Sequence, residues 1–244
     1  MNTCKLPPYT LFLFLFASLS LYAQKDKLSI TEIFEQSKAV YENNPVFQIQ
    51  MEYSLFRNIE NPVIIEQYEG FLFKRNQDMY LKIHHTELLI VKGEYVKVNH
   101  KQKAIEYNKG EIFDLNNNPL KIEQYLSYFS EKEVFDDGNY WRCELSTPKY
   151  TQLPYGAITM FFNKETFVME KQILLMVAPK SIMDEHGQLT EDLKYLKIEV
   201  KNFSTTPKTQ NKYFDIQEFI SHENKAIKTS SKFKEYKLIN RTVK

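Results

Sequence analysis

Glycine, cysteine and long apolar runs are scarce in this sequence, and each scarcity excludes a class of protein. With 6 glycines in 244 residues, the chain has no glycine-rich loop of the kind that cradles phosphates. Of its 2 cysteines, only Cys143 lies beyond the N-terminal segment, so the chain beyond that segment can form no internal disulfide. No Gly-x-Ser-x-Gly elbow and no His-Glu-x-x-His zinc helix occur, which excludes the familiar hydrolase motifs.

The one long apolar run lies at the N-terminus. Lys5 is the only charge before it, an unbroken apolar core follows at 11–17, and Ala23 ends a small-residue cleavage site. We therefore expect residues 1–23 to be a removable secretory signal peptide, with an uncleaved anchor as the alternative. Cys4 precedes the apolar core, which is the wrong side for lipidation. We expect an exported, soluble periplasmic protein without a lipid anchor.

The remaining residues, 24–244, are expected to form a single domain. Basic and acidic residues number 32 and 31, and removal of Lys5 leaves the two signs equal. A balanced charge argues against a dedicated nucleic-acid binder, and we expect no nucleic-acid partner. No later segment approaches 18 consecutive apolar residues, so we expect no further membrane-spanning helix. We also expect a monomer.

Aromatic content and alternation predict a protein made mainly of β structure. The 18 phenylalanines and 16 tyrosines suit pleated strands. Residues 46–56 alternate most clearly, because the odd-numbered positions are apolar and the even-numbered ones from Gln48 to Ser54 are polar. Further strands are predicted at 63–74, 78–84, 87–92, 94–99, 103–108, 140–146, 157–163, 167–177, around 196–200 and at 227–240. Short connections favour antiparallel neighbours.

Two helices are predicted beside these strands. Ser29-Ile30-Thr31-Glu32 reads as a capping box that starts a helix over 29–43. Asn116-Asn117-Asn118-Pro119 opens a second helix, whose apolar stripe extends to Phe129. The insert that contains it ends in a turn at Asp136-Asp137-Gly138-Asn139. The fold class that follows is mainly β (α+β), a curved antiparallel sheet with two helices on one side.

Candidate catalytic and metal-binding residues are few. Cys143 alternates with Trp141 and Leu145 on one strand face, which indicates a buried, inert thiol. His84 and His85 are adjacent, so a strand would point them to opposite faces and prevent a shared metal ion. The other histidines fall in predicted turns or loops: His100, His186 and His222. We expect no enzyme activity, no catalytic residue, no metal and no cofactor.

Three segments carry a resemblance to a known family. In Tyr68–Leu81, a glycine-bearing strand is followed by Lys-Arg, a short turn and an aromatic-rich strand. The hairpin over Glu87–Val96 has Gly93 at its turn. Ile198–Phe203, followed by Phe214–Ile216, is similar to a closing strand with a phenylalanine motif. In these segments the chain resembles the outer-membrane lipoprotein carrier family (LolA/LolB-like), and the position of Cys4 favours the soluble LolA-type branch.

The resemblance implies an incomplete antiparallel β-barrel, covered on its open side by the helices and enclosing an apolar cavity. In that family the cavity carries the acyl chains of lipoproteins across the periplasm without covalent chemistry. Burial of each methylene contributes about 0.8 kcal/mol, so an acyl chain needs a water-free site to cross. The implied partners are lipid-modified proteins or free lipid, with inner- and outer-membrane transport components.

Strand faces and this resemblance together indicate the residues that would line the cavity. They are Phe47, Ile49, Met51, Tyr53, Met79, Leu81, Ile83, Met160, Leu196, Ile198 and Val200. The first helix would act as a lid through Ile33, Phe34 and Val40, and Arg75 would hold this lid by a polar contact. Methionine suits such a lining, because its unbranched side chain adapts to irregular surfaces.

Two other functions stay open at this point. An exported, non-enzymatic scaffold module on the same fold would hold a protein partner on the sheet surface. An enzyme with an unfamiliar site is the third hypothesis, and a cavity lined by several charged side chains would favour it.

Overall fold

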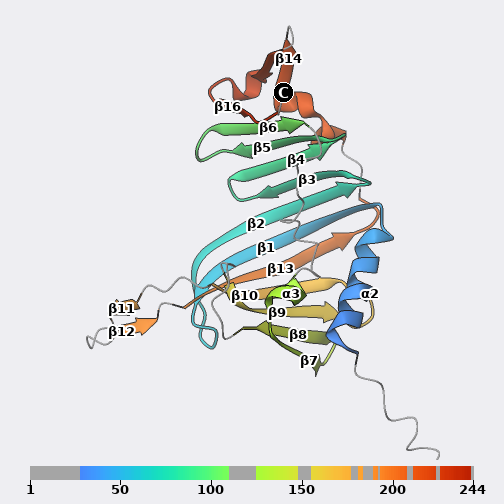
Figure 1. The fold of residues 1–244 in the computed structure, drawn as a ribbon, viewed down its shortest axis with the longest axis vertical. Coiled ribbons are helices and arrows are strands. Elements are labelled where there is room, and N and C mark those ends of the chain that lie inside the picture. The colour runs from blue at the N-terminus through green and yellow to red at the C-terminus, as the bar shows by residue number, and fades with distance from the viewer. Residues whose placement is uncertain are drawn as a thin grey trace, which may run out of the picture.

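One twelve-stranded sheet dominates the structure, a computed structural model that describes residues 28–109, 125–147, 155–176, 181–183, 189–191, 193–207, 211–223 and 226–242 (Figure 1). Helix α2 (Ile30–Glu42) precedes six strands: β1 (Val46–Arg57), β2 (Val63–Arg75), β3 (Asp78–Ile83), β4 (Thr86–Val91), β5 (Glu94–Asn99) and β6 (Ala104–Lys109). After the short helix α3 (Tyr125–Tyr128) come β7 (Glu131–Asp137), β8 (Tyr140–Ser146), β9 (Tyr155–Asn163), β10 (Met169–Met176) and β13 (Lys194–Ser204). Between the last two, β11 (Ser181–Met183) and β12 (Leu189–Glu191) pair in a separate projecting arm.

The C-terminal part of the chain folds into short elements. They are the 3-10 helices η3 (Asn211–Phe214), η4 (Ile216–Glu218) and η5 (Ser231–Phe233), and the strands β14 (Ile220–Glu223), β15 (Ala226–Thr229) and β16 (Lys237–Asn240). Strands β14 and β15 form a small hairpin of their own, whereas β16 joins the large sheet beside β6.

The strand order is β16-β6-β5-β4-β3-β2-β1-β13-β10-β9-β8-β7, so the sheet is open and has β16 and β7 as its two edges. Neighbours are antiparallel except for β16, which runs parallel to β6. The predicted mainly β, antiparallel class is therefore confirmed. The described strands do not close on one another, and the incomplete barrel stays a prediction.

Tight turns explain why β2 to β6 follow one another in the sheet as they do in the sequence. Lys92 and Gly93, between β4 and β5, have φ of 49° and 76°. Positive φ at both central residues is the geometry of a type I′ turn, whose twist matches that of a two-stranded ribbon. Asn76 (φ 56°) and His84 (φ 51°) occupy the left-handed region at the two preceding turns.

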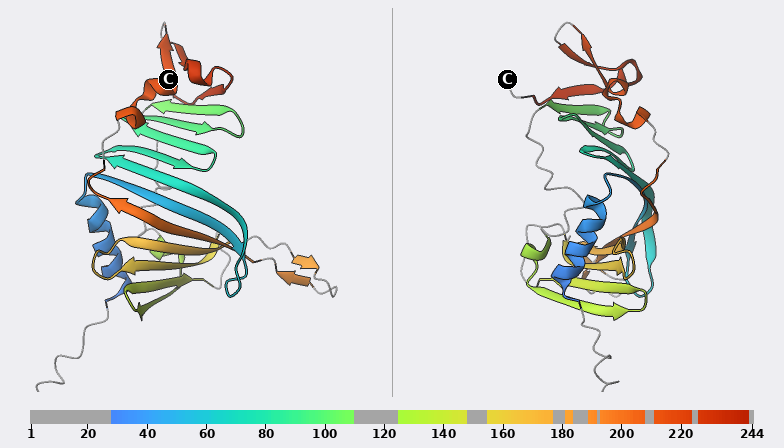
Figure 2. Two further views of the ribbon diagram at one scale, coloured as in Figure 1. Left: turned by 180° about the vertical axis from the view of Figure 1, so that it is seen from behind. Right: turned by 90° about the vertical axis from the view of Figure 1, so that its right-hand side faces the viewer.

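Two apolar cores lie on opposite faces of the sheet, toward its two ends (Figure 2). Helix α2 starts at the predicted capping box, where Ser29 and Glu32 bond to each other's backbone N–H groups. Its buried face packs on β8, β9 and β10, together with Phe129 and Leu126 from the region of α3. The C-terminal segment from η3 to β16 packs on the other face, over β2 to β6.

Two expectations about individual elements need correction, and two others concern residues that lie mostly or wholly outside the described ones. Residues 131–137, expected in the insert before a turn, form the edge strand β7, which pairs with β8 across the predicted turn at Gly138. The single strand predicted at 227–240 is divided into β15, η5 and β16. Most of the predicted second helix and all of residues 1–23 lie outside the described residues.

The ring of Tyr53 on the neighbouring strand leaves no room for a side chain at Gly70 on β2. A Cβ on Gly70 would lie 2.5 Å from Cε2 of Tyr53, and this ring is buried and stacked on Tyr68 at 5.1 Å between centroids. Gly70→Ala is therefore expected to lower the free energy of unfolding by about 1–3 kcal/mol, measured by urea denaturation. In a Tyr53→Ala background the same change should cost much less. An equal cost in both backgrounds would show that the ring contact is not the cause.

Candidate functional site: an apolar face of the open sheet

The strand registers place all eleven predicted lining residues on one face of the sheet, here called the apolar face. On β1, Met51 stands opposite Val200 of β13 and Gly70 of β2, and Gly70 stands opposite Ile83 of β3. The pairing continues from β1 across β13, β10 and β9 in the row Tyr53, Ile198, Gln172 and Met160. The other five predicted residues fall on the same side by alternation: Phe47, Ile49, Met79, Leu81 and Leu196.

Burial divides this face into covered ends and an open middle. Met160 is completely buried under α2, and Phe47 and Ile49 are buried beside Tyr41 from the last turn of α2. Between these ends, six lining residues are only half-buried and are called here the open strip. They are Met51, Leu81, Ile83, Leu196, Ile198 and Val200.

Neighbouring strands add apolar residues that the sequence did not single out. Leu88 and Ile90 of β4 stand opposite Leu81 and Met79 and lie on the apolar face. Because β4 is apolar on both faces, alternation alone could not tell which of its residues belong with the lining. The pairing register of β4 with β3 shows that Leu88 and Ile90 are the ones that do.

Helix α2 carries the residues that were predicted to form a lid. Ile33 and Phe34 are almost fully buried, and the Phe34 ring lies 5.4 Å from that of Phe162. Val40 is half-buried near the last turn of the helix. Arg75 lies elsewhere: by register it faces the opposite side of the sheet, where its guanidinium group stands over the Phe214 ring at 4.1 Å.

Arg75 and Asp78 stabilise the β2–β3 turn. The Nη2 atom of Arg75 donates to Oδ2 of Asp78 at 3.0 Å, and the second Asp78 oxygen accepts from the backbone N–H of Lys92 at 3.2 Å. The Arg75 side chain therefore ties the sheet to the C-terminal segment.

Cys143 is placed as the sequence predicted. It is completely buried in the core under α2, between Trp141 and Leu145 on the same strand face. Burial raises the pKa of its thiol to about 12. Since the thiolate is the reactive form, this cysteine is inert at neutral pH.

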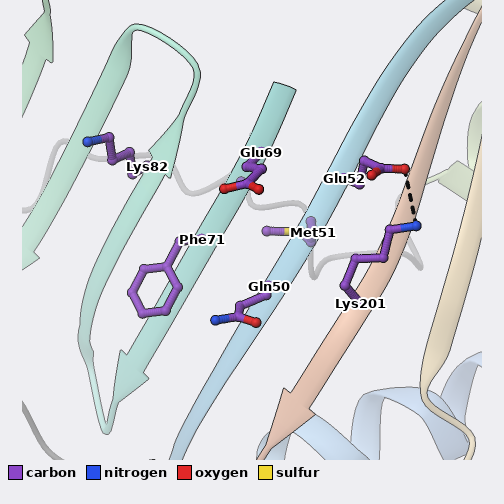
Figure 3. A pocket seen from close by; sticks show the side chains of 8 residues that line it. Gln50, Met51, Glu52, Glu69, Phe71, Lys82 and Lys201 are labelled. Atoms are coloured by element: carbon purple, nitrogen blue, oxygen red, sulfur yellow. Dashed lines mark ion pairs between the residues drawn. The ribbon is translucent and has the colours of Figure 1, made fainter. Parts of the chain in front are cut away.

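The opposite face of the central strands is charged and holds a hollow of about 460 Å³ (Figure 3). The lining side chains of Glu52, Glu69 and Lys82 come from β1, β2 and β3, and Lys201 comes from β13. Lys201 Nζ lies 3.1 Å from a carboxylate oxygen of Glu52 and 3.1 Å from one of Glu199. Partial burial by itself raises the pKa of Glu199, but hydrogen bonds from the lysines at 201 and 197 outweigh it and lower the pKa overall.

This hollow has the charged lining that would favour an enzyme, but its groups do not form a catalytic set. Its lysines form ion pairs with neighbouring carboxylates, and its described lining includes no histidine, cysteine, serine or threonine. A nucleophile next to a base is the usual requirement for covalent catalysis. The hollow therefore points to a solvated polar face opposite the apolar one.

The histidines depart from expectation in two places. His84 and His85 form a turn instead of continuing a strand, so their rings lie side by side at 3.7 Å between centroids and do not face opposite sides. His100 lies in a turn, as predicted, but its side chain is partly buried, and its Nε2 lies 2.8 Å from Oε1 of Glu87. Its Nδ1 lies 3.0 Å from the hydroxyl of Tyr236, which joins the C-terminal segment to the sheet. Among the described residues, no group of three potential ligands is arranged to hold a metal ion.

Glu87 is the centre of this polar cluster. Burial by itself raises the pKa of its carboxyl, but hydrogen bonds from Tyr80 at 2.9 Å and from His100, with the charge of Lys82, lower the pKa overall. A depressed pKa contributes stability above the unfolded value, and this contribution is lost as the pH falls through the folded value.

The Glu87→Gln variant is expected to lose this pH-dependent stability. At about pH 6 its free energy of unfolding should be lower than that of the parent by about 1–3 kcal/mol, because charge-assisted hydrogen bonds are lost. The difference should shrink as the pH falls through the lowered pKa of the parent carboxyl, below the usual range of a glutamate. Urea denaturation across this range is the measurement, and a difference that stays constant with pH would contradict the assignment.

Comparison with known proteins finds matches among solved structures. An uncharacterized conserved protein from Thermus thermophilus is similar with a TM-score of 0.45 at 9% identity, over 88% of this chain and 100% of that chain. A LolA superfamily protein from Nitrosomonas europaea has a TM-score of 0.35 at 11% identity, over 78% of this chain and 98% of that one. Lipoprotein LppX from Mycobacterium tuberculosis has a TM-score of 0.35 at 7% identity, over 74% and 99%. No family model and no curated protein matches the sequence.

At these identities and TM-scores the neighbours carry no argument about this chain, so its fold and function are argued from its own residues. In the part of the chain that the structure describes, no helix is both long enough and apolar enough to cross a membrane.

Proposed function

We propose that this protein is an exported periplasmic carrier that binds the acyl chains of lipid-modified proteins, or of free lipid, on its apolar face without catalysis. The sheet and α2 together act as the incomplete barrel of a LolA-type carrier. The acyl chain lies along the open strip, and α2 forms the lid at one side of it.

The observation that carries this proposal is the half-buried state of the open strip. Its six apolar side chains come from β1, β3 and β13 and lie between two covered cores. Apolar side chains that stay partly exposed on one face leave a free-energy gain, about 25 cal/mol per Å² of apolar surface, for any apolar molecule that covers them. An acyl chain is long, narrow and apolar, as such a strip requires.

Tyr41 marks the border between lid and strip. Its ring packs against Phe47 at 5.6 Å and Phe203 at 5.9 Å, so the last turn of α2 lies against the covered end of the face. A modest outward movement of this turn would extend the strip toward Phe47. The lid therefore acts through the aliphatic and aromatic contacts of α2.

The proposal is tested by purifying the full chain after export to a bacterial periplasm and extracting it with organic solvent. Mass spectrometry is expected to find acyl lipid or a lipid-modified peptide in near-stoichiometric amount. Protein that carries no lipid, and that also fails to bind the fluorescent fatty acid cis-parinaric acid, would overturn the carrier function. Recovery of a protein without lipid modification as the only bound molecule would favour the scaffold function.

A further inference from the structure

Exposed apolar side chains gather at one end of the molecule. Among the described residues, six large hydrophobic side chains are exposed, and five of them lie at the end of the β1–β2 hairpin or beside it. They are Ile59, Val63, Ile64, Ile65 and Leu193, with exposed fractions between 42% and 64%. Leu193 belongs with them because it precedes Lys194, which stands opposite Arg57 at the end of β1. These five residues are called here the hairpin tip.

The backbone holds these side chains outward in a defined turn. Asn58 has a positive φ of 58°, and its Oδ1 accepts hydrogen bonds from the backbone N–H groups of Glu60 at 2.9 Å and Asn61 at 3.3 Å. On β2 the register shifts, since Leu55 stands opposite Glu66 but Phe56 stands opposite Ile64. Ile65 is thus the extra residue of a β-bulge, which turns the strand edge locally.

A protein partner fits this tip poorly. A stable protein–protein interface uses about 20–30 residues on each side, whereas the tip offers five. Addition of a partner strand along β2 is opposed by the bulge at Ile65 and the charge of Glu66, two features that protect strand edges from pairing.

Attachment to a lipid bilayer needs far fewer contacting residues than a protein–protein interface does. A few aliphatic side chains entering the boundary between head groups and acyl chains are enough for reversible attachment. The charges around the tip are balanced, with Arg57 and Lys194 against Glu60 and Glu66, so attachment should not depend on anionic lipid. Behind the tip, Phe56 and Tyr195 stack at 5.5 Å between centroids and form an aromatic base.

We propose that the hairpin tip is a membrane-docking surface that places the protein on a lipid bilayer. This inference rests on the proposed carrier function and adds the site where cargo enters or leaves. From the tip, the apolar face continues along β1 and β13 in three cross-strand pairs: Leu55 with Leu196, Tyr53 with Ile198 and Met51 with Val200. On the same face the pair of Arg57 and Lys194 lies between the tip and Leu55, so an acyl chain that leaves a bilayer at the tip passes these two cationic side chains before it meets the open strip.

Vesicle flotation with the full chain tests the docking surface. The vesicles are phosphatidylcholine, with and without phosphatidylglycerol. The parent is expected to float with both kinds and to change little with salt. The triple variant Val63→Ser/Ile64→Ser/Ile65→Ser should bind at least about tenfold more weakly. The matched control is Tyr128→Ser, which removes the sixth exposed apolar side chain, 52% exposed and outside the tip, and should float like the parent.

Several results would overturn docking by the tip. They are failure of the parent to float with either vesicle, equal flotation of parent and triple variant, and binding only to protease-sensitive native membranes, which would indicate a protein partner. Cis-parinaric acid binding without vesicles separates this inference from the carrier function. The triple variant should still bind the fatty acid. If no variant binds it while flotation still depends on the tip, the carrier function fails and the docking surface stands.

Discussion

The Phe34→Ala variant is expected to lower the free energy of unfolding by about 3–5 kcal/mol, the usual cost of removing a buried aromatic ring. Phe34 is 1% exposed and is the largest of the fully buried side chains through which α2 packs on the sheet. It contacts Phe162 of β9 within the core that also contains Cys143 and Met160. An isolated helix of 13 residues is marginal in water, so α2 depends on this packing to stay in place.

Two neighbouring variants on the same helix serve as controls. Glu35→Ala changes an exposed residue and should alter stability by less than about 0.5 kcal/mol. Ser37→Ala changes a side chain that is completely buried and whose hydroxyl has no hydrogen-bond partner among the described residues, so it should leave stability unchanged or raise it.

Urea denaturation gives the three free energies, and hydrogen exchange over residues 30–42 reports whether α2 detaches. A loss below about 1 kcal/mol for Phe34→Ala would show that α2 contributes little to the core. A large loss for Ser37→Ala would show that the helix face is sensitive to any change, and the packing explanation for Phe34 would then fail.

The Met51→Asp variant is expected to abolish acyl-chain binding. Met51 lies at the centre of the open strip, between Gly70 and Val200 on the neighbouring strands. A carboxylate at this position would lose its hydration when an acyl chain covers it, at an effective cost of several kcal/mol. Since each 1.4 kcal/mol is about a factor of ten in affinity, binding of cis-parinaric acid should weaken by about 100-fold or more.

The adjacent residue provides a matched control for Met51→Asp. Gln50 is exposed and points to the charged face, so Gln50→Asp introduces the same charge one residue away on the other side of the sheet. It should bind the fatty acid like the parent. Equal weakening in both variants would indicate a general electrostatic effect. Unchanged binding in a folded Met51→Asp variant, checked by circular dichroism, would remove Met51 from the lining.

Local signals in the sequence predicted most of the strands and the start of α2. The alternation over residues 46–56 became β1, with Phe47 and Ile49 buried and Gln50 exposed. The Ser29–Glu32 capping box and the Lys92-Gly93 turn were confirmed, since each depends on backbone groups only a few residues apart.

Elements with weak or mixed local signals were missed. Strand β7 carries five charged residues in seven, so it shows no apolar alternation, and it forms because β8 pairs with it. Charges suit such an edge strand because they discourage pairing with other molecules. The cluster of Tyr80, Glu87, His100 and Tyr236 was also missed, since it joins residues up to 156 positions apart, from Tyr80 to Tyr236.

The scarcity of glycine, of cysteine and of catalytic motifs, together with the aromatic alternation, determined without any structure that the chain is a mainly β protein with no familiar hydrolase motif. Alternation also determined which side chains of β1 share a face. Only the tertiary structure decided that β13 pairs with β1, which brings Ile198 and Val200 beside Tyr53 and Met51. That pairing joins residues about 145–150 positions apart, and no local propensity specifies it, because it depends on burying apolar faces across the whole sheet.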